Sequence, residues 1–349
     1  MVLRWVEGFE THQVPTQWDR RYASRSGQFA IEAGRVFGSA GTLQAPIFIA
    51  PSFGLADVWG IGFGVRVEAL IGAFSAANLD ATPQGLYLEK GTTEQVHLEI
   101  VSNAGSFEVR IKRGSTTLGI TTSTFAYGSW HHFELKVTVH TSTGAFELRH
   151  NEANVLSGSG VNTANAGSNQ ADVFAIRFTT TSTNARFDDI FVWDGTGSAV
   201  NDFQGDAVVE GIEVTGAGAS TQWTPSAGSN FDNVNDPGNA GPDDSGAGGF
   251  NSSDTAAQID LYAFSDLTQI DGAIIGVQLD TQLAMASAGS RTVDTKYRDP
   301  DTTVVDIASK AVTSTSYDSF HDVMSLNPRD SLAWDVADVN GGQFGVEIA

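Results

Sequence analysis

Apolar and polar residues alternate with a period of two through much of the first half of the chain. The clearest runs are residues 95–100, 107–112, 133–140 and 174–178, in which every second residue is Val, Leu, Ile or Phe. Successive side chains of a strand point to opposite faces of a sheet. Each run therefore predicts an antiparallel strand with one buried face.

Short turn sequences separate these runs. Residues 103–105, 112–115 and 142–144 each combine Gly with Asn, Ser or Thr, residues that favour tight connections. Seven or more such strands within about 190 residues predict a two-sheet sandwich or jelly roll. Gly60, Gly62 and Gly64 fall inside another alternating run, where they indicate close packing on a sheet and not a phosphate-binding turn.

A further strand pattern covers residues 187–193. Phe187, Phe191 and Trp193 fall on one face of an ideal strand, and Ile190 and Val192 on the other. A strand that is apolar on both faces is usually buried on both. Turn-forming and flexible residues follow, so residues 198–202 are predicted to be a linker between two domains.

The residues after this linker predict a second, smaller β-domain. Strands are expected at 208–214, 274–283, 293–298, 302–307 and 344–348, with a hairpin turn at Asp299-Pro300. The run 216–255 is rich in Gly, Asn, Asp, Ser and Pro and predicts a long loop. Short helical turns are expected at 253–261 and 329–336.

Three phrases of this sequence resemble a known family. Residues 186–206, RFDDIFVWDGTGSAVNDFQGD, are similar to the closing strand of concanavalin-like, laminin-G-like jelly-roll domains in tailed-phage virion proteins. There, D-D-I-x-V-x-D precedes an N-D-F-x-G-D link to a small C-terminal β-domain. Residues 128–156 resemble the laminin-G pattern that begins W-H-H, and residues 331–335 resemble a phrase before the last strand of those phage proteins. The resemblance covers most of residues 1–197 and specifies the fold better than a ligand.

The composition narrows the possible partners. The sequence has no Cys, so it has no disulfide and no Cys nucleophile. The formal net charge is −22, and residues 203–349 hold 5 Lys or Arg against 22 Asp or Glu. Such an acidic surface repels phosphate backbones, so nucleic acid is not an expected partner. The acidity fits solubility or adaptation to salty water, and alternatively docking to a basic partner or cation binding.

No signal peptide or membrane-spanning run is evident in the sequence, so we expect a protein made in the host cytoplasm without membrane insertion.

Tests for catalytic motifs do not favour an enzyme. No run carries the E-x-D-x-E carboxylates of laminarinase-type enzymes, and Asp188 and Asp189 are expected to face opposite ways. Gln95-Val96-His97 matches the Q-[IV]-H strand of alginate-lyase-like members of this fold, in which His could abstract a proton. The nearest Arg-containing match, 147–149, follows this motif instead of preceding it, so we expect a solvent-facing His97.

His and Asp residues of the sequence are candidate metal ligands. His131 and His132 are adjacent on a predicted strand and cannot readily share one ion, while His140 and His150 belong to other strands. Calcium is the metal that the Asp-rich segments could bind. The candidate calcium ligands are Asp188, Asp189, Asp194, Asp232 and Asp236.

Aromatic side chains in polar segments can stack on sugar rings. The candidate glycan-binding residues are Trp18, Tyr22 and Trp223.

The sequence thus predicts an all-β protein with a concanavalin-like jelly roll at 1–197, a linker at 198–202 and a smaller β-sandwich at 203–349. The resemblance implies a non-enzymatic structural or adhesive virion protein of the tail, neck or capsid surface. Its expected partners are other virion proteins, further copies of itself as a homo-oligomer, and host-surface glycan. The alternatives are a polysaccharide depolymerase or lyase on the same fold, and a capsid decoration protein without a ligand.

Overall fold

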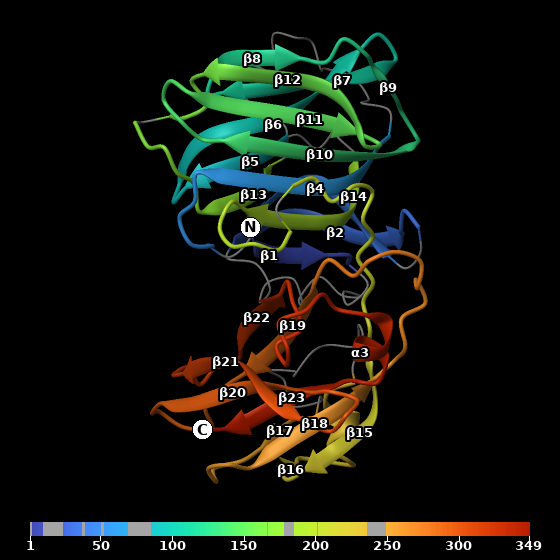
Figure 1. The fold of residues 1–349 in the computed structure, drawn as a ribbon, viewed down its shortest axis with the longest axis vertical. Coiled ribbons are helices and arrows are strands. Elements are labelled where there is room, and N and C mark those ends of the chain that lie inside the picture. Colours follow the sequence, from blue (N-terminus) through green and yellow to red (C-terminus); the bar gives the residue numbers. More distant parts are fainter. Residues whose placement is uncertain are drawn as a thin grey trace. The chain divides into compact units, whose positions relative to one another are not determined.

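The computed structural model describes residues 2–9, 24–36, 39–49, 52–68, 85–165, 167–177, 185–200, 202–235 and 249–349. This described part is built almost entirely of antiparallel strands, so the predicted all-β class is confirmed (Figure 1). It forms two compact units, one of residues 2–9 and 24–209 and one of residues 210–349. No helix in these ranges is long and apolar enough to cross a membrane.

The first unit is one long sheet of fourteen strands. Their bounds are β1 Val2–Glu7, β2 Ser24–Ala33, β3 Ser39–Ile49, β4 Val58–Val67, β5 Gly85–Lys90, β6 Thr93–Asn103, β7 Ser106–Arg113, β8 Thr116–Ile120, β9 Phe125–Ala126, β10 Trp130–Thr138, β11 Gly144–His150, β12 Ala153–Val161, β13 Val173–Arg177 and β14 Ala185–Asp194. The main hydrogen-bonded order is β12-β11-β10-β4-β14-β3-β13-β5-β6-β7-β8. The four alternating runs correspond to β6, β7, β10 and β13.

This sheet folds back on itself into two layers. β7 and β10 lie far apart along the strand order, yet the rings of Phe107 and Phe133 lie 6.5 Å apart. Phe125 of β9 packs edge-on against Phe133 at 4.9 Å. At the ends of the order, Gly119 of β8 lies beside Phe146 of β11 and Leu156 of β12. The apolar faces therefore enclose one core between two layers, as in the predicted jelly-roll sandwich.

Glycines in β4 create room on the outer face of one layer. A Cβ atom at Gly60 would overlap the ring of Trp193, and a Cβ at Gly62 would overlap the ring of Phe191. Both aromatic side chains come from the neighbouring β14 and are fully buried. The structure thus agrees with the close sheet packing predicted for this run of glycines.

A β-bulge changes the predicted faces of β14. Asp188 pairs with Gly64, whereas Phe191 pairs with Gly62, so β14 contains one extra residue at this point. Asp189 has φ +51°, outside the strand region. The extra residue moves every later side chain to the opposite face. Phe187 contacts Phe63 in the inter-layer core, while Phe191 and Trp193 lie on the outer face, so the prediction that the three share a face was wrong.

The second unit is a smaller β-sandwich. Its elements are β15 Val214–Thr221, β16 Thr224–Pro225, the 3-10 helix η1 Phe231–Asn233, β17 Asn251–Ser252, β18 Ile259–Phe264, β19 Val277–Leu283, β20 Arg291–Arg298, β21 Val304–Val312, β22 Asp318–Met324, α3 Val336–Asn340 and β23 Gln343–Ile348. One sheet has the order β15-β18-β23-β20-β21, and the β19-β22 pair forms a separate small sheet. The predicted hairpin turn at Asp299-Pro300 joins β20 to β21.

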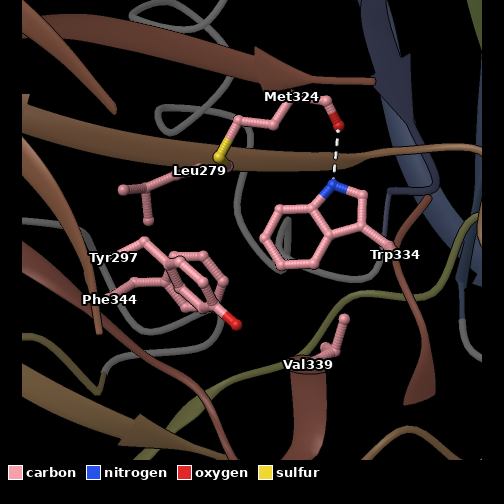
Figure 2. Close-up of a cluster of buried hydrophobic side chains, with 6 residues drawn as sticks. All are labelled: Leu279, Tyr297, Met324, Trp334, Val339 and Phe344. Atoms are coloured by element: carbon pink, nitrogen blue, oxygen red, sulfur yellow. Dashed lines mark hydrogen bonds between the residues drawn. The ribbon is translucent and has the colours of Figure 1, made fainter. Parts of the chain in front are cut away.

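Trp334 lies at the centre of this second core. Figure 2 shows it with Leu279, Tyr297, Met324, Val339 and Phe344. Its indole Nε1 donates a hydrogen bond to the Met324 carbonyl at 3.0 Å, and its ring packs edge-on against Tyr297 at 5.2 Å. Leu279 and Met324 come from the small sheet, whereas Tyr297 and Phe344 come from the larger one. The cluster therefore joins the two layers of the unit.

Local predictions in the second unit need correction. The run 216–255, expected to be a loop, begins with most of β15 and contains β16, η1 and β17 in its described part. Residues 253–261 form no helix, because their last residues enter β18, which pairs on both sides within the sheet. Tertiary pairing here overrides weak helix propensity.

The helix expected at 329–336 lies later, at α3. Asp335 caps α3, since its side chain accepts a hydrogen bond from the Asp338 backbone N–H at 2.8 Å. The Asp338 side chain in turn accepts a hydrogen bond from the backbone N–H of Asp335, and the two bonds together form a capping box. The helix therefore starts after Asp335.

Candidate functional site

Asp188 and Asp189, at the bulge in β14, both bind Arg35. The Asp188 carboxylate accepts a hydrogen bond from the backbone N–H of Arg35 at 2.6 Å, and Asp189 accepts one from its guanidinium Nε at 2.7 Å. The same guanidinium binds Asp206 at 2.5 Å and donates to the Ala207 carbonyl at 3.0 Å. We call Arg35, Asp188, Asp189 and Asp206 the Arg35 cluster. The bulge allows two adjacent carboxylates to converge, contrary to the prediction that they face apart.

Burial dominates the electrostatics of the Arg35 cluster. Desolvation, with the nearby charge of Asp189, raises the pKa of Asp188 to about 8, and desolvation also raises the pKa of Asp189. Close to the cluster, burial lowers the pKa of His132 to about 4, although its imidazole lies 3.9 Å from Asp206. Such shifts occur at functional sites and in structural ion-pair networks alike. In the described part of the chain, every hydrogen-bond or ion-pair partner of the Arg35 cluster belongs to the first unit.

The segment after β14 is bound to the first unit along its length. We call residues 202–209 the exit segment, since the second unit begins at residue 210. The Glu134 carboxylate accepts bonds from the backbone N–H groups of Gln204 at 2.7 Å and Gly205 at 3.1 Å. The backbone N–H of Val209 donates to Asp189 at 2.8 Å. Residues 203–209, which the sequence assigned to the second domain, therefore make these contacts with the jelly roll.

Side chains of the exit segment also bind to the outer face of the sheet. Lys136 of β10 pairs with Asp202 at 2.9 Å. The guanidinium of Arg149 lies 3.7 Å from the centre of the Phe203 ring, a cation–π contact. Burial raises the pKa of Glu134 to about 7, although two backbone donors favour its charged form. The residues of the N-D-F-x-G-D phrase thus attach the chain to the jelly roll through an ion pair, a cation–π contact and backbone hydrogen bonds.

The other calcium candidates do not join the Arg35 cluster. Asp194 accepts hydrogen bonds from Arg4 at 2.6 Å and from the backbone and hydroxyl of Thr196. Asp232 accepts from the backbone and hydroxyl of Ser229 in the second unit. Asp236 lies outside the described residues. Across the described ranges, no group of three or more His, Asp or Glu side chains could hold a metal ion.

Of the glycan candidates, Trp18 and Tyr22 lie outside the described residues. Trp223 is half-buried against the second unit's core and donates its indole Nε1 to the Gln258 carbonyl at 3.0 Å. Its backbone N–H binds Asp260, which belongs to a network with Asn230 and Tyr262. The network fixes Trp223 at the start of the Gly- and Asn-rich run.

A second polar group lies around His97, on the face of β5, β6 and β7 turned away from the inter-layer core. Gln95 and His97 share this face, as predicted, but His97 is only 1% exposed and not solvent-facing. Its Nδ1 lies 2.7 Å from Glu94, and its ring stacks on Tyr87 at 4.7 Å. A carboxylate at Nδ1 holds the ring with Nε2 as a potential base, and Nε2 has no hydrogen-bond partner among the described residues.

Charged side chains surround His97. Lys112 lies directly across from it on β7, and Glu99 lies two residues along β6. The Glu99 carboxylate is fully buried and lies 3.5 Å from the Lys112 ammonium, and no group in the described part of the chain donates a hydrogen bond to it. Arg177 of β13 pairs with Glu89 and lies 5.1 Å from the Tyr87 ring. Gln95, by contrast, accepts a hydrogen bond from the backbone N–H of Asn165 and so holds the loop that contains Asn165. Arg149, of the match that follows the motif in the sequence, lies over Phe203.

Sequence reasoning missed Arg35, Glu134, Asp206 and Tyr87. Arg35 lies 153 residues from Asp188, and no local pattern links them. Tyr87 had a usable signal, because it precedes a turn by a few residues and pairs directly with His97 across the β5–β6 hairpin. A register drawn through that hairpin would have placed both side chains on one face.

No protein-family model matches the chain, and no curated protein matches it. Among solved structures, an endo-β-1,4-glucuronan lyase from the fungus Trichoderma reesei is 13% identical, with a TM-score of 0.37, over 55% of this chain and 95% of the other. Domain 4 of an extracellular arabinanase from Geobacillus stearothermophilus, in complex with arabinotriose, is 15% identical, with a TM-score of 0.37, over 55% and 92%. Carbohydrate-binding module CBM66 from Bacillus subtilis is 8% identical, with a TM-score of 0.30, over 48% and 94%. These likenesses are too weak to assign a family, an activity or a ligand.

Proposed function

We propose that this chain is a non-enzymatic structural and adhesive component of a tailed-phage particle. The observation that carries the proposal is the role of the residues behind the phage resemblance. Asp188, Asp189 and the exit segment form one internal attachment that fixes where the chain leaves the jelly roll. In this proposal one unit docks on the particle, the other faces outward, and the chain leaves the jelly roll at a fixed point. The Arg35 cluster supplies buried ion pairs for this purpose.

Glycan contact belongs to the same proposal. Trp18, Tyr22 and Trp223 are its candidate residues, and many copies on a particle would strengthen a weak single site through multivalency. A homo-oligomer and contacts with other virion proteins are part of the proposal for the same reason. A glycan array probed with the purified chain tests this part. Binding that disappears in Trp18→Ala but persists in Trp130→Phe supports it, whereas no binding favours a decoration protein without a ligand.

The experiment for the main proposal is a protein inventory of purified particles from the source of this sequence. The proposal expects the chain at many copies per particle, retained after density-gradient purification. Its presence only in the soluble lysate would reject the proposal. The same inventory is repeated with particles that carry Arg35→Gln, and with Arg66→Gln as a surface control. It shows whether the chain needs the bound exit segment to be incorporated into particles.

One observation favours a second candidate, a polysaccharide lyase. The Glu94–His97 pair leaves Nε2 without a partner in the described ranges, on a buried polar face that also carries Tyr87, Lys112 and Arg177. A base held by a carboxylate and surrounded by cations could remove a proton next to a sugar carboxylate. Ultraviolet assays for unsaturated products on alginate, glucuronan and host exopolysaccharide test this. Cleavage that is lost in His97→Ala would replace the non-enzymatic proposal.

A further inference from the structure

Two histidines of the first unit, His131 of β10 and His150 of β11, lie with their ring nitrogens facing each other. His131 Nδ1 and His150 Nε2 are 3.0 Å apart. The sequence placed them on different strands with no sign of contact. They meet because β10 and β11 are paired, with His150 opposite Phe133, so that His131 and His150 are diagonal neighbours on one face.

The second nitrogen of His131 fixes its tautomer. His131 Nε2 lies 2.9 Å from the Ala126 carbonyl oxygen. A carbonyl only accepts, so Nε2 carries the hydrogen and the neutral ring presents a lone pair at Nδ1. Metal-ligating histidines share this arrangement, in which one ring nitrogen donates to a backbone carbonyl and the other presents a lone pair.

Aromatic neighbours hold both rings in place. Phe107 and Phe125 pack edge-on against His131 at 5.4 and 5.6 Å, and Phe125 and Phe133 contact His150 at 4.7 and 5.0 Å. His131 is 9% exposed, whereas His150 is half-buried and gives access from solvent.

We propose that His131 and His150 bind a transition-metal ion of the Zn²⁺, Ni²⁺ or Cu²⁺ class. Nitrogens bind such ions at about 2.0–2.1 Å, so two nitrogens 3.0 Å apart can be neighbouring ligands of one ion once the rings turn to direct both lone pairs at it. For binding, His150 carries its hydrogen on Nδ1 instead of Nε2, so that both facing nitrogens present lone pairs, and water completes the coordination shell. Imidazole ligands suit these ions, and Cu²⁺ is expected to bind most tightly. The two strands then carry a metal cross-link beside the aromatic end of the core.

The test uses the purified full chain with Cu²⁺ or Zn²⁺ alone. Calorimetric titration is expected to give a saturable site with one ion per chain, and added Zn²⁺ should raise the unfolding temperature of the first unit. His150→Gln should abolish both effects. The matched control His321→Gln removes a histidine of the second unit that pairs with Asp280 and should leave both unchanged.

Electron paramagnetic resonance of the Cu²⁺-loaded wild type provides a readout that does not depend on a variant folding. Hyperfine structure from two imidazole nitrogens is the expected spectrum. Absence of saturable binding, a spectrum without two imidazole nitrogens, or equal binding by His150→Gln would overturn the proposal.

Discussion

At the scale of single residues, burial of ionisable side chains gives the first unit a pH dependence with a defined sign. The pKa of Asp188 is raised to about 8 and that of Glu134 to about 7, so folding favours their protonated forms. The stability they contribute is complete below the unfolded pKa values and is lost as pH rises through 7 and 8. His132, with a pKa of about 4, acts in the opposite sense, because its contribution is lost as pH falls below about 6.5.

Above pH 6.5 only the acidic groups of this set still titrate. We therefore predict that the unfolding free energy of the first unit decreases between pH 6.5 and pH 8. Asp188→Asn should flatten this decrease, because its side chain cannot ionise. Urea unfolding of both proteins at the two pH values measures the effect. A wild-type stability that stays constant or rises over this interval contradicts the assignment.

Gly60 provides a second prediction at this scale. In Gly60→Ala the added methyl group overlaps the buried ring of Trp193, and we expect a loss of about 1–3 kcal/mol of stability or more. Gly54→Ala is the matched control, since nothing lies within 4 Å of its added Cβ, and a change within about 0.5 kcal/mol is expected. Denaturant unfolding compares the two. Equal stabilities would mean that β14 does not pack on β4 as described.

At the scale of elements, one buried guanidinium binds the exit segment at Asp206 and Ala207. The Arg35 side chain is 9% exposed and that of Asp189 is 2% exposed, so removing Arg35 leaves a carboxylate buried without its partner. Breaking such a pair typically costs about 3–5 kcal/mol. We predict that Arg35→Gln destabilises the first unit by this order and speeds amide hydrogen exchange at residues 203–209.

The control for this change is Arg66→Gln. Arg66 pairs with Glu68 at 3.0 Å, and both side chains are about a third exposed, so the expected loss is within about 1 kcal/mol. Exchange at 203–209 should not change in this control. Unaltered exchange in Arg35→Gln would show that other contacts hold the exit segment.

In the second unit, the packing of the two layers of the sandwich depends on Trp334, which contacts residues of both. Trp334→Ala removes an almost fully buried ring and the hydrogen bond to Met324, and we expect a loss of about 3–5 kcal/mol. Trp223→Ala serves for comparison, because Trp223 is only half-buried, and should cost less. Thermal unfolding of the two variants measures both losses of stability. A larger loss in Trp223→Ala than in Trp334→Ala would contradict the described core.

The sequence predicted elements where side-chain alternation decides the structure. β6, β7 and β10 have strict period-two patterns, and each pairs with at least one strand that is close in the chain, so local rules sufficed to find them. β14 departed from its predicted faces because a bulge adds one residue, and neither Asp188 nor Asp189 signals a bulge by type.

The sites were less predictable than the strands for the same reason. Arg35, Asp206 and Glu134 meet only through tertiary contacts, and the His131–His150 pair depends on strand register. By contrast, the capping box of Asp335 and Asp338 is a local signal that would have placed α3 correctly.

At the scale of the whole molecule, two β-units follow one another in a chain whose acidic charge is concentrated in residues 203–349. Each unit has its own core, as each needs to fold around its own sheets. In the first unit, Asp188, Asp189 and Asp206 bind Arg35, and Asp189 also binds the exit segment at Val209. This arrangement suits a protein that connects and holds, and it motivates the proposed place in a particle.

Imaging whole particles from the source of this sequence at residue-level resolution tests that central claim most directly. The account predicts that both β-units will be found in the map in many ordered copies, with the exit segment bound to Arg35 and Glu134. Particles that lack the chain altogether would contradict the account.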